Sequence, residues 1–382
     1  MTLPSVAAFT DTYLPTVNGV TYTIQSWRDC WRQRGGDMPI VYPGSDEYDP
    51  EEREYPVGSV PFPFYEEFRV GVPRVPDDVG DPAIVHAHTP FGLGMSAMRL
   101  ARSRNLPLVA SYHTPTSEYA AYVSLGDYVE RTIRRTARRY ERWFFDRADV
   151  VVAPSERTRE HVRDRIGIET TVEVVPNGID TDRFQPVDPV DFLDRYDLPT
   201  DRPIVGYTGR HGYEKCLSDI VAATDGMDVT VVFGGDGPAR EDVESRAEVA
   251  DVDVRFLGFL PREELPAFYS ALDVFAFPSP VETQGLVALE ANACGTPVAA
   301  VDSGALSDTV EDGRNGYSYP QGDIDAFRDT IERTLSEREE LGDQCLTRRE
   351  TISIEYAVDR LMDIYADVLG VESFDTPEAK SE

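Results

Sequence analysis

The chain has 382 residues, enough to bury a sizeable core, and this length favours two domains over one. Its 69 acidic and 37 basic residues give a formal net charge of −32 at pH 7, so a nucleic-acid-binding function is disfavoured because such a surface repels phosphate backbones. Apolar residues make up 41% of the chain and follow regular strand and helix patterns, which argues against a disordered protein.

The acidic residues are spread evenly, in a composition that resembles cytosolic proteins of salt-accumulating halophiles. The four cysteines are far apart, without a C-x-x-C pair, and we expect them to be buried thiols in a reducing compartment. The sequence has neither a run of 18 apolar residues nor the basic-then-apolar start of a signal peptide. We therefore expect a cytoplasmic protein, which could still lie on the inner face of the membrane.

The chain opens with an apolar strand (residues 6–9), a loop and a helix, which is the first unit of a parallel α/β fold. The loop reads D-T-Y-L-P-T-V-N-G-V, and its Asn18-Gly19 pair indicates a turn into the helix. Ligands of such folds bind at the carboxyl ends of the strands, where this loop lies. A lone N-G pair is weak evidence, since most are only turns.

Further strands are expected at residues 39–42, 58–62, 83–87 and 108–111. His86 and His88 share a face of the third of these, but no third metal ligand is evident, so we expect no metal and place His88 at the strand end, lining a cleft. Tyr112 and His113 follow the last strand, where α/β enzymes place their chemistry. A solitary histidine is, however, more often structural than functional.

Residues 128–147 form an amphipathic helical pattern with seven arginines against three acidic residues, and residues 143–145 at its end are aromatic. In so acidic a chain, this pattern suggests docking on an anionic membrane surface. The alternative is a helix that packs its apolar stripe on the core while its arginines pair with acids. The residues of the expected docking surface are Arg131, Arg134, Arg135, Arg138, Arg139, Arg142 and Trp143.

Strands at residues 149–154 and from 171 onwards complete the first half, and residues 183–200 are rich in Asp and Pro, as in an interdomain linker. The triplet Asp180-Thr181-Asp182 matches a metal-binding D-x-D, but it lacks the usual flanking strand and we interpret it as a coincidence. A second α/β unit begins with the strand at 203–209.

Arg210 and Lys215 frame the loop R-H-G-Y-E-K that follows this strand and enters a helix. Lys215 is one of only two lysines in the chain, the other being Lys380 in the polar C-terminal segment. Two cations beside helix-start amides are what a leaving diphosphate requires as negative charge develops on it. This loop is therefore a candidate site for an anionic leaving group.

The stretch from 273 to 298 reads D-V-F-A-F-P-S-P-V-E-T-Q-G-L-V-A-L-E-A-N-A-C-G-T-P-V. An apolar strand is stopped by two prolines, and Gly285 then opens a helix that ends near Gly295. Glu282 lies in the loop before this helix and Glu290 lies within it. A helix N-terminus can bind an anion such as a diphosphate, and the carboxylates beside it can accept hydrogen bonds from sugar hydroxyls.

This stretch resembles the Glu-x-seven-Glu signature of the retaining glycosyltransferases of family 4. The resemblance extends over about residues 3–370, in the family's order, through D-T-Y-L-P-T-V-N-G-V, V-P-N-G-I-D and G-D-G-P. The loop at Ser303-Gly304 departs from the usual Gly-Gly-x-x-Glu. The resemblance implies the α/β GT-B fold, in which two doubly wound Rossmann-like domains face each other across a cleft.

The expected organisation is an acceptor-binding domain at 1–182, a linker at 183–200 and a nucleotide-sugar-binding domain at 201–352. A helix at 353–371 would cross back to the first domain, and a disordered tail would occupy 372–382.

By resemblance, the catalytic residues are His113, Glu282, Arg210 and Lys215. The donor would be bound by Gly19, Arg210, Lys215, Gly258, Phe259, Glu282, Gly285, Leu286 and Glu290, with Gly258 and Phe259 at the base and Glu290 at the ribose. Asn18, His88 and Tyr112 are the candidates for acceptor contact or cleft lining. No cofactor or essential metal is expected, since cationic side chains replace the metal.

The predicted reaction moves a hexosyl group with retention from a UDP- or GDP-linked sugar to an acceptor hydroxyl. The Y-H-T segment, the E-T-Q-G-L-V variant and the basic helix together resemble enzymes that glycosylate lipids, so a membrane lipid or polyprenyl-linked acceptor is expected. The alternatives are a soluble transferase that makes a disaccharide or polysaccharide, a sugar-nucleotide epimerase of the same fold and a non-catalytic binding protein.

Overall fold

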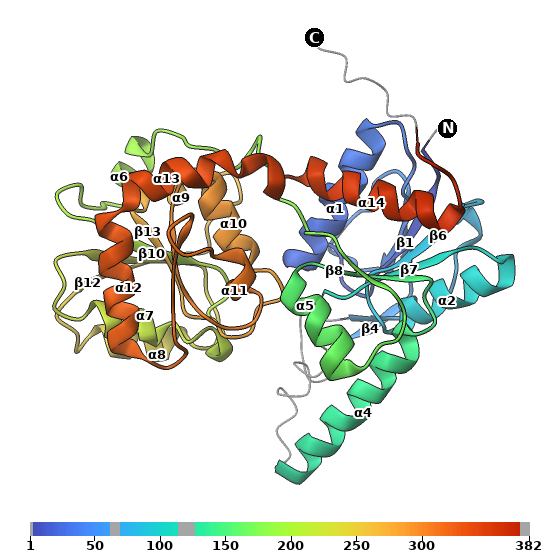
Figure 1. Cartoon of the computed structure of the whole chain (residues 1–382), viewed down its shortest axis with the longest axis horizontal. Coiled ribbons are helices and arrows are strands. Elements are labelled where there is room, and N and C mark those ends of the chain that lie inside the picture. Colours follow the sequence, from blue (N-terminus) through green and yellow to red (C-terminus); the bar gives the residue numbers. More distant parts are fainter. Residues whose placement is uncertain (1–2, 62–68, 114–126, 375–382) are drawn as a thin grey trace. The chain divides into compact units, whose positions relative to one another are not determined.

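The computed structural model describes residues 3–61, 69–113 and 127–374, apart from the side chains of Pro61 and of residues 127–134. The chain divides into two compact units, unit 1 (Met1–Asn177 and Ile354–Glu382) and unit 2 (Gly178–Ser353). Each unit contains its own parallel β-sheet with helices packed on it (Figure 1). The α/β class and the two Rossmann-like halves that the sequence predicts are thereby confirmed.

Unit 1 is built on a seven-stranded parallel sheet with the order β3-β2-β1-β6-β7-β8-β9. Its strands are β1 (Val6–Phe9), β2 (Ile40–Pro43), β3 (Glu54–Val57), β6 (Ile84–Ala87), β7 (Leu108–Ser111), β8 (Val150–Ala153) and β9 (Val172–Val174). A separate antiparallel pair is formed by β4 (Ser59–Pro61) and β5 (Arg69–Gly71). The strand order reverses between β1 and β6, which is where doubly wound sheets bind ligands at their carboxyl edge.

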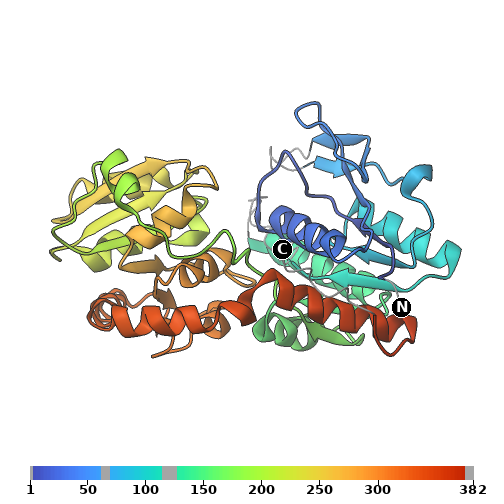
Figure 2. The same ribbon diagram turned by 90° about the horizontal axis from the view of Figure 1, so that it is seen from above.

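The helices of unit 1 cover both faces of its sheet. They are α1 (Gly19–Gln33), η1 (Asp77–Val79), α2 (Gly92–Arg104), α4 (Asp127–Phe145), α5 (Glu156–Glu160), the π-helical η2 (His161–Ile166) and α14 (Ile354–Leu369). On one face α1 and α14 lie side by side, as Figures 1 and 2 both show. On the other face α2, α4 and η2 form a second core. Strand residues alternate between these two cores because successive side chains point to opposite faces.

Unit 2 has a six-stranded parallel sheet with the order β12-β11-β10-β13-β14-β15. Its strands are β10 (Ile204–Thr208), β11 (Thr230–Gly234), β12 (Asp253–Gly258), β13 (Val274–Phe277), β14 (Val298–Val301) and β15 (Gly316–Tyr319). Its helices are α6 (Val190–Arg195), η3 (Tyr213–Lys215), α7 (Ser218–Thr224), α8 (Arg240–Ala247), α9 (Leu265–Ala271), α10 (Leu286–Ala293), α11 (Leu306–Thr309), α12 (Ile324–Ser336), α13 (Arg338–Thr347) and η4 (Arg349–Ile352). One continuous apolar core joins the sheet to helices α6 to α12 and to η4.

The local signals read from the sequence explain where the elements begin. Val6–Phe9 and Val274–Phe277 are apolar and completely buried, as expected for inner strands of parallel sheets. Asn18 caps α1, its side chain accepting a hydrogen bond from the Thr21 N–H. Helix α10 begins directly after Gly285 and ends before Gly295, as its flanking glycines predict.

Three strands, β3, β5 and β15, lie where the sequence predicts none, and β5 forms the antiparallel pair with β4. Of the other two, β3 follows an acidic segment and β15 begins in the turn-like sequence N-G-Y-S-Y. In the structure Glu54 is buried in β3, where the Arg28 guanidinium donates to its carboxylate. Strand β15 pairs with β14 from Val298 to Val301. Both segments are short of apolar residues and become strands through their partners.

The unit boundary falls at Asn177–Gly178, earlier than the expected domain end at 182. Residues 183–200, read as a linker from their Asp and Pro content, contain α6 and bury Phe184 and Phe192 in the core of unit 2. Phe374, placed in the expected tail, packs in the α1–α14 core of unit 1. Residues 375–382 lie outside the described residues.

None of the helices in the described ranges is both long enough and apolar enough to cross a membrane.

Candidate active site

In unit 2 the two predicted cations lie at the carboxyl end of β10, and each is paired with a carboxylate. The Lys215 ammonium lies 2.6 Å from Glu282 Oε1, which joins two residues that the sequence assigned to one site. The Arg210 guanidinium lies 2.6 Å from Glu214 Oε1. The Lys215–Glu282 pair is the more enclosed, with 18% and 15% of the side chains exposed, against about a third for the other pair. Both cations are therefore positioned before any ligand arrives.

Helix α10 begins at Leu286, shortly after Glu282 of the Lys215–Glu282 pair. Gly285 precedes it with a φ of 77°, a left-handed conformation that favours glycine, and a Cβ there would lie 2.7 Å from Leu306 Cδ2. The first N–H groups of an α-helix have no partner within the helix, so those of Leu286 and Val287 are available to an anion.

Glu290 lies on the buried side of α10 and is 8% exposed. The Tyr269 hydroxyl donates a 2.7 Å hydrogen bond to its Oε2. Burial raises the pKa of Glu290 to about 7, against the lowering effect of the Tyr269 hydrogen bond and of the Arg262 charge. Near neutral pH this carboxyl is thus divided between its neutral and charged forms.

The two residues expected at the donor base are the last residue of β12, Gly258, and the residue that follows it, Phe259. Gly258 has a φ of 72°, and its carbonyl accepts a 2.6 Å hydrogen bond from the Gly235 N–H of the neighbouring G-D-G-P turn. Phe259 is 77% exposed, which is unusual for a large apolar side chain. An exposed ring beside a glycine can stack against a flat ligand.

The loop that departs from the family's Gly-Gly-x-x-Glu pattern supports Glu282. The Ala305 N–H donates to the Glu282 carbonyl at 3.1 Å, and the Ser303 hydroxyl donates to the Pro280 carbonyl at 3.0 Å. Gly304 has a φ of 57°, and a Cβ at this position would lie 3.1 Å from the Glu282 carbonyl oxygen. No pattern in the sequence indicates this supporting role.

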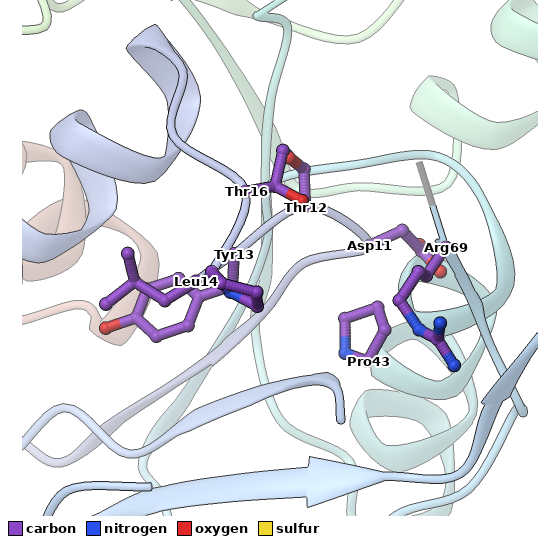
Figure 3. A pocket seen from close by; sticks show the side chains of 8 residues that line it. Asp11, Thr12, Tyr13, Leu14, Thr16, Pro43 and Arg69 are labelled. Atoms are coloured by element: carbon purple, nitrogen blue, oxygen red, sulfur yellow. The ribbon is translucent and has the colours of Figure 1, made fainter. Parts of the chain in front are cut away.

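In unit 1 the loop after β1 lines a pocket, which Figure 3 shows with Tyr13 and Leu14 at one end and Asp11 and Arg69 at the other. The other lining residues are Thr12, Pro15, Thr16 and Pro43. Asn18, a candidate contact residue, donates from its amide to the Thr12 hydroxyl at 2.8 Å, and Gly19 is the exposed first residue of α1. The pocket thus lies at the strand order reversal.

Asp11 in this pocket is 1% exposed and was not singled out from the sequence. Its carboxylate accepts hydrogen bonds from the Thr89 hydroxyl at 2.8 Å and from the Leu93 N–H at the start of α2. Burial raises its pKa to about 6, although these hydrogen bonds act in the opposite direction. Asp11 therefore fastens the loop after β1 to the start of α2.

His86, His88 and His113 form a stack at the carboxyl ends of β6 and β7. The ring centroids of His86 and His88 are 4.1 Å apart, and those of His88 and His113 are 5.4 Å apart. Burial lowers the pKa of all three rings, to about 3 for His86 and about 4 for His113, so they are neutral at physiological pH. His88 and His113, expected in one cleft, are thus neighbours.

Tyr112 does not line a cleft with these histidines. Its ring is 1% exposed and packs against Phe145 in the opposite core, with a centroid distance of 5.4 Å. The physical reason is the alternation of side chains, because Ser111 and His113 face the α1–α14 side and the residue between them faces the other.

Helix α4 exposes the described arginines of the expected docking surface. Arg135, Arg138, Arg139 and Arg142 are exposed, and Trp143 is 38% exposed. Phe144 and Phe145 are instead buried in the core with α2, which corrects the expectation that all three aromatic residues face a membrane. The side chains of Arg131 and Arg134 lie outside the described residues.

Only part of the α4 arginine cluster is engaged in ion pairs. Arg142 pairs with Asp146 at 3.3 Å and with Glu169. Arg135, Arg138 and Arg139 form no ion pair with any residue that the structure describes. The interpretation of α4 as a helix packed on the core is therefore correct for its apolar side at Phe144 and Phe145. The pairing of its arginines with acids is observed for Arg142.

Within the described part of the chain, no group of three His, Cys, Asp or Glu side chains is arranged to hold a metal ion. The sequence identified the cations and carboxylates of unit 2 but not the residues that hold them. Glu214 pairs with Arg210, and Tyr269 donates to Glu290. In unit 1 the Tyr365 hydroxyl, which holds His86, was missed in the same way.

Comparison with known proteins agrees with this geometry. Residues 17–183 match the family described as Glycosyltransferase Family 4, and residues 191–347 match Glycosyl transferases group 1. The chain is 30% identical to a GDP-mannose-dependent alpha-mannosyltransferase of Mycolicibacterium smegmatis, over 96% of this chain and 98% of that protein. It is 26% identical to an alpha-monoglucosyldiacylglycerol synthase of Streptococcus pneumoniae, over 99% of this chain and 89% of that protein.

Among solved structures, a sucrose-phosphate synthase from Thermosynechococcus elongatus has the same fold, with a TM-score of 0.75 at 22% identity, covering 96% of this chain and 99% of that one. The two-domain GT-B fold is thus shown, together with full-length similarity to a sugar transferase. The chain is a glycosyltransferase and belongs to glycosyltransferase family 4.

Proposed function

We propose that this enzyme transfers a hexosyl group, with retention, from a nucleotide-diphosphate sugar to a lipid or lipid-linked acceptor at the inner face of the membrane. The observation that carries the donor half is the arrangement at β10 and α10, where Arg210, Lys215 and the α10 amides gather positive charge beside Glu282. Positive charge fixed in advance is what stabilises a departing diphosphate.

In this proposal the donor diphosphate replaces the internal carboxylates as the partner of the two cations. Lys215 exchanges Glu282 Oε1 for a phosphate oxygen, and the released Glu282 accepts a hydrogen bond from the sugar. Glu290 binds the ribose, and Gly258 with the exposed Phe259 contacts the base. Gly19 of unit 1 approaches the diphosphate, and His113 contacts the transferred sugar. The cations and amides supply the charge that a metal would otherwise provide, so no divalent metal is required.

Retention is proposed to proceed by attack on the face that the leaving group occupies. A double-displacement mechanism would need a carboxylate nucleophile opposite a second carboxyl group. Glu282 is held by Lys215 and Glu290 by Tyr269, which suits both for binding rather than for attack. The leaving phosphate would accept the proton of the acceptor hydroxyl.

The acceptor half rests on α4 and on the relatives. One relative is named for GDP-mannose, and another is named as a synthase of monoglucosyldiacylglycerol, a lipid. The exposed Arg135, Arg138 and Arg139, with the half-exposed Trp143, have the chemistry of a surface for anionic lipid headgroups.

The first experiment incubates the protein with UDP-glucose, UDP-galactose or GDP-mannose, with and without lipid extract, and measures released UDP or GDP and the masses of the lipids. One lipid that gains one hexose from one donor is the expected result. Donor consumption with a water-soluble acceptor alone would contradict the lipid acceptor and favour a soluble transferase. A changed sugar nucleotide in the absence of any acceptor would indicate an epimerase.

The docking surface is tested separately by replacing Arg135, Arg138 and Arg139 with Gln. Each charge near an anionic surface contributes about 1 kcal/mol, so sedimentation with phosphatidylglycerol liposomes should fall roughly a hundredfold at low salt. The matched control replaces Arg99, Arg102 and Arg104 of α2, which are also exposed, and should bind as the wild type does. Equal losses in both triple variants would refute a specific α4 surface.

A further inference from the structure

The histidine stack of unit 1 contains a ring that the proposed reaction does not use. His88 lies between His86 and His113, and its centroid is 5.9 Å from that of Trp27. His88 is 2% exposed, so water does not reach its ring nitrogens and their hydrogen-bond partners must come from the protein.

The neighbouring His86 is held at both ring nitrogens. Its Nδ1 lies 2.7 Å from the Tyr365 hydroxyl of α14, and its Nε2 lies 2.8 Å from the Ser111 hydroxyl of β7. His86 is therefore fixed in orientation and forms a flat surface against which the His88 ring stacks at an interplanar angle of 25°.

His88 has only one nitrogen engaged. Its Nδ1 lies 3.1 Å from His113 Nε2, whereas its buried Nε2 has no hydrogen-bond partner among the described residues. A single proton lies between His88 and His113, and it can belong to either ring.

The two possibilities differ in what they leave buried. If His113 donated from Nε2, neutral His88 would carry its own proton on Nε2, as a buried N–H without an acceptor among the described residues. If His88 donates from Nδ1, its Nε2 keeps only an unused lone pair. Orphaned buried N–H groups are the rarer and costlier defect, so the second arrangement is favoured. The lowered pKa values of both rings keep each of them neutral, which excludes a doubly protonated ring.

We propose that His88 is a positioning residue that donates from Nδ1 to His113 Nε2 and thereby holds His113 as the Nδ1–H tautomer. The nitrogen that His113 has left for a ligand is then a hydrogen-bond donor and not a base. This inference rests on the proposed function only in taking the ligand to be the transferred sugar, toward which His113 would donate to a hydroxyl oxygen.

The tautomer can be measured without any substrate. The chain has five histidines, so a two-bond ¹H–¹⁵N spectrum of the ¹⁵N-labelled full-length protein at pH 7.5 contains few ring signals. The His113 signals are identified by their loss in His113→Asn. The expected result is an Nδ1–H pattern for His113, opposite to the Nε2–H form that free histidine prefers. An Nε2–H pattern in the wild type would overturn the proposal.

Two variants then test the role of His88. His88→Asn keeps an N–H donor near the position of Nδ1, and it should preserve the His113 tautomer and keep kcat within about threefold of the wild type. His88→Leu removes the donor and should move the proton of His113 to Nε2 and lower kcat roughly tenfold. A purely structural role would not predict rescue by Asn together with retention of the tautomer.

The outcomes separate this inference from the proposed function. If His88→Leu leaves His113 in the Nδ1–H form, or leaves kcat unchanged, the positioning role is wrong even when the enzyme is active. If the wild type turns over no sugar nucleotide, the proposed function fails, and the spectra of the wild type and the two His88 variants still decide the tautomer.

Discussion

In unit 1 the titratable side chains of the candidate site are neutral rings packed on one another, whereas in unit 2 they are cations and carboxylates held in pairs. His86, His88 and His113 are buried and have no charged partner among the residues that the structure describes. Lys215 and Glu282 form a partly exposed ion pair. Unit 1 can thus offer hydrogen bonds that do not depend on charge, and unit 2 can exchange one negative partner for another. A neutral sugar suits groups of the first kind, and a diphosphate suits groups of the second kind.

The largest effect is expected from removing the more enclosed cation, Lys215. Lys215→Gln keeps a polar side chain but loses the charge, so kcat/KM for the sugar nucleotide should fall about 10²–10³-fold, as for removal of one group that stabilises developing charge. The measurement is steady-state release of UDP or GDP. The control is Lys380→Gln, the only other lysine in the chain, which should retain wild-type activity. A loss smaller than about fivefold would contradict a role of Lys215 at the leaving group.

A smaller effect with two opposite signs is expected from Glu282→Gln. Losing the contact to the sugar should lower kcat roughly 10–100-fold, whereas freeing Lys215 should tighten binding of the nucleoside diphosphate product roughly 3–10-fold. Calorimetric titration with UDP and GDP measures the second effect. Weaker binding of both nucleotides would mean that Glu282 holds Lys215 in place rather than competing for it.

Acidification should change the stability of the two units in opposite directions. The folded-state pKa of His86 is lowered to about 3 and that of His113 to about 4, from 6.5, so the unfolded chain binds protons first and unit 1 loses stability as pH falls below about 6.5. The raised pKa of Asp11, about 6, offsets part of this loss. In unit 2 the folded-state pKa of Glu290 is raised to about 7, so its contribution is lost as pH rises through 7 and is regained on acidification.

When the pH falls from 8 to about 5.5, His86 and His113 should each lower the free energy of unfolding of unit 1 by roughly 1–1.5 kcal/mol. Over the same range Glu290 should raise the free energy of unfolding of unit 2 by roughly 2 kcal/mol. Hydrogen exchange followed by peptide mass spectrometry, with rates corrected for pH, reports the two units separately. Glu290→Gln should abolish the gain in unit 2 and leave the loss in unit 1. A loss of equal size in both units would show that overall acidity and not these groups governs the response.

Much of the fold could be predicted because inner strands of parallel sheets are apolar on both faces and reveal themselves as short apolar runs. Strand β3 could not be predicted in this way, because its first residue is the charged Glu54. The Arg28 guanidinium and the Tyr13 and Tyr48 hydroxyls stabilise this carboxylate inside the protein, and no local pattern indicates these contacts. The proline and aspartate content of residues 183–200 predicts a linker, but this segment packs on unit 2 through the buried side chains of Phe184 and Phe192.

The residues of the site were easier to predict than their partners. Spacing around a helix start identified Glu282 and Glu290, and the rarity of lysine identified Lys215. No local pattern shows that Tyr269 donates to Glu290 or that Tyr365 reaches His86, since 21 and 279 positions separate these pairs. Tyr112 could have been assigned correctly from alternation alone, because it lies between two residues of the opposite face.

The contact between Tyr365 and His86 has a consequence for how the chain is made. Residues 178–353 are synthesised between the two segments of unit 1, so unit 2 leaves the ribosome whole while unit 1 still lacks α14. Until then Trp27, Trp31 and the histidine stack lack the helix that covers them, and the seven-stranded sheet carries an open apolar face. The first segment of unit 1 therefore finishes folding only after unit 2 and α14 have been made, and the His86 ring, against which His88 stacks, is anchored only then.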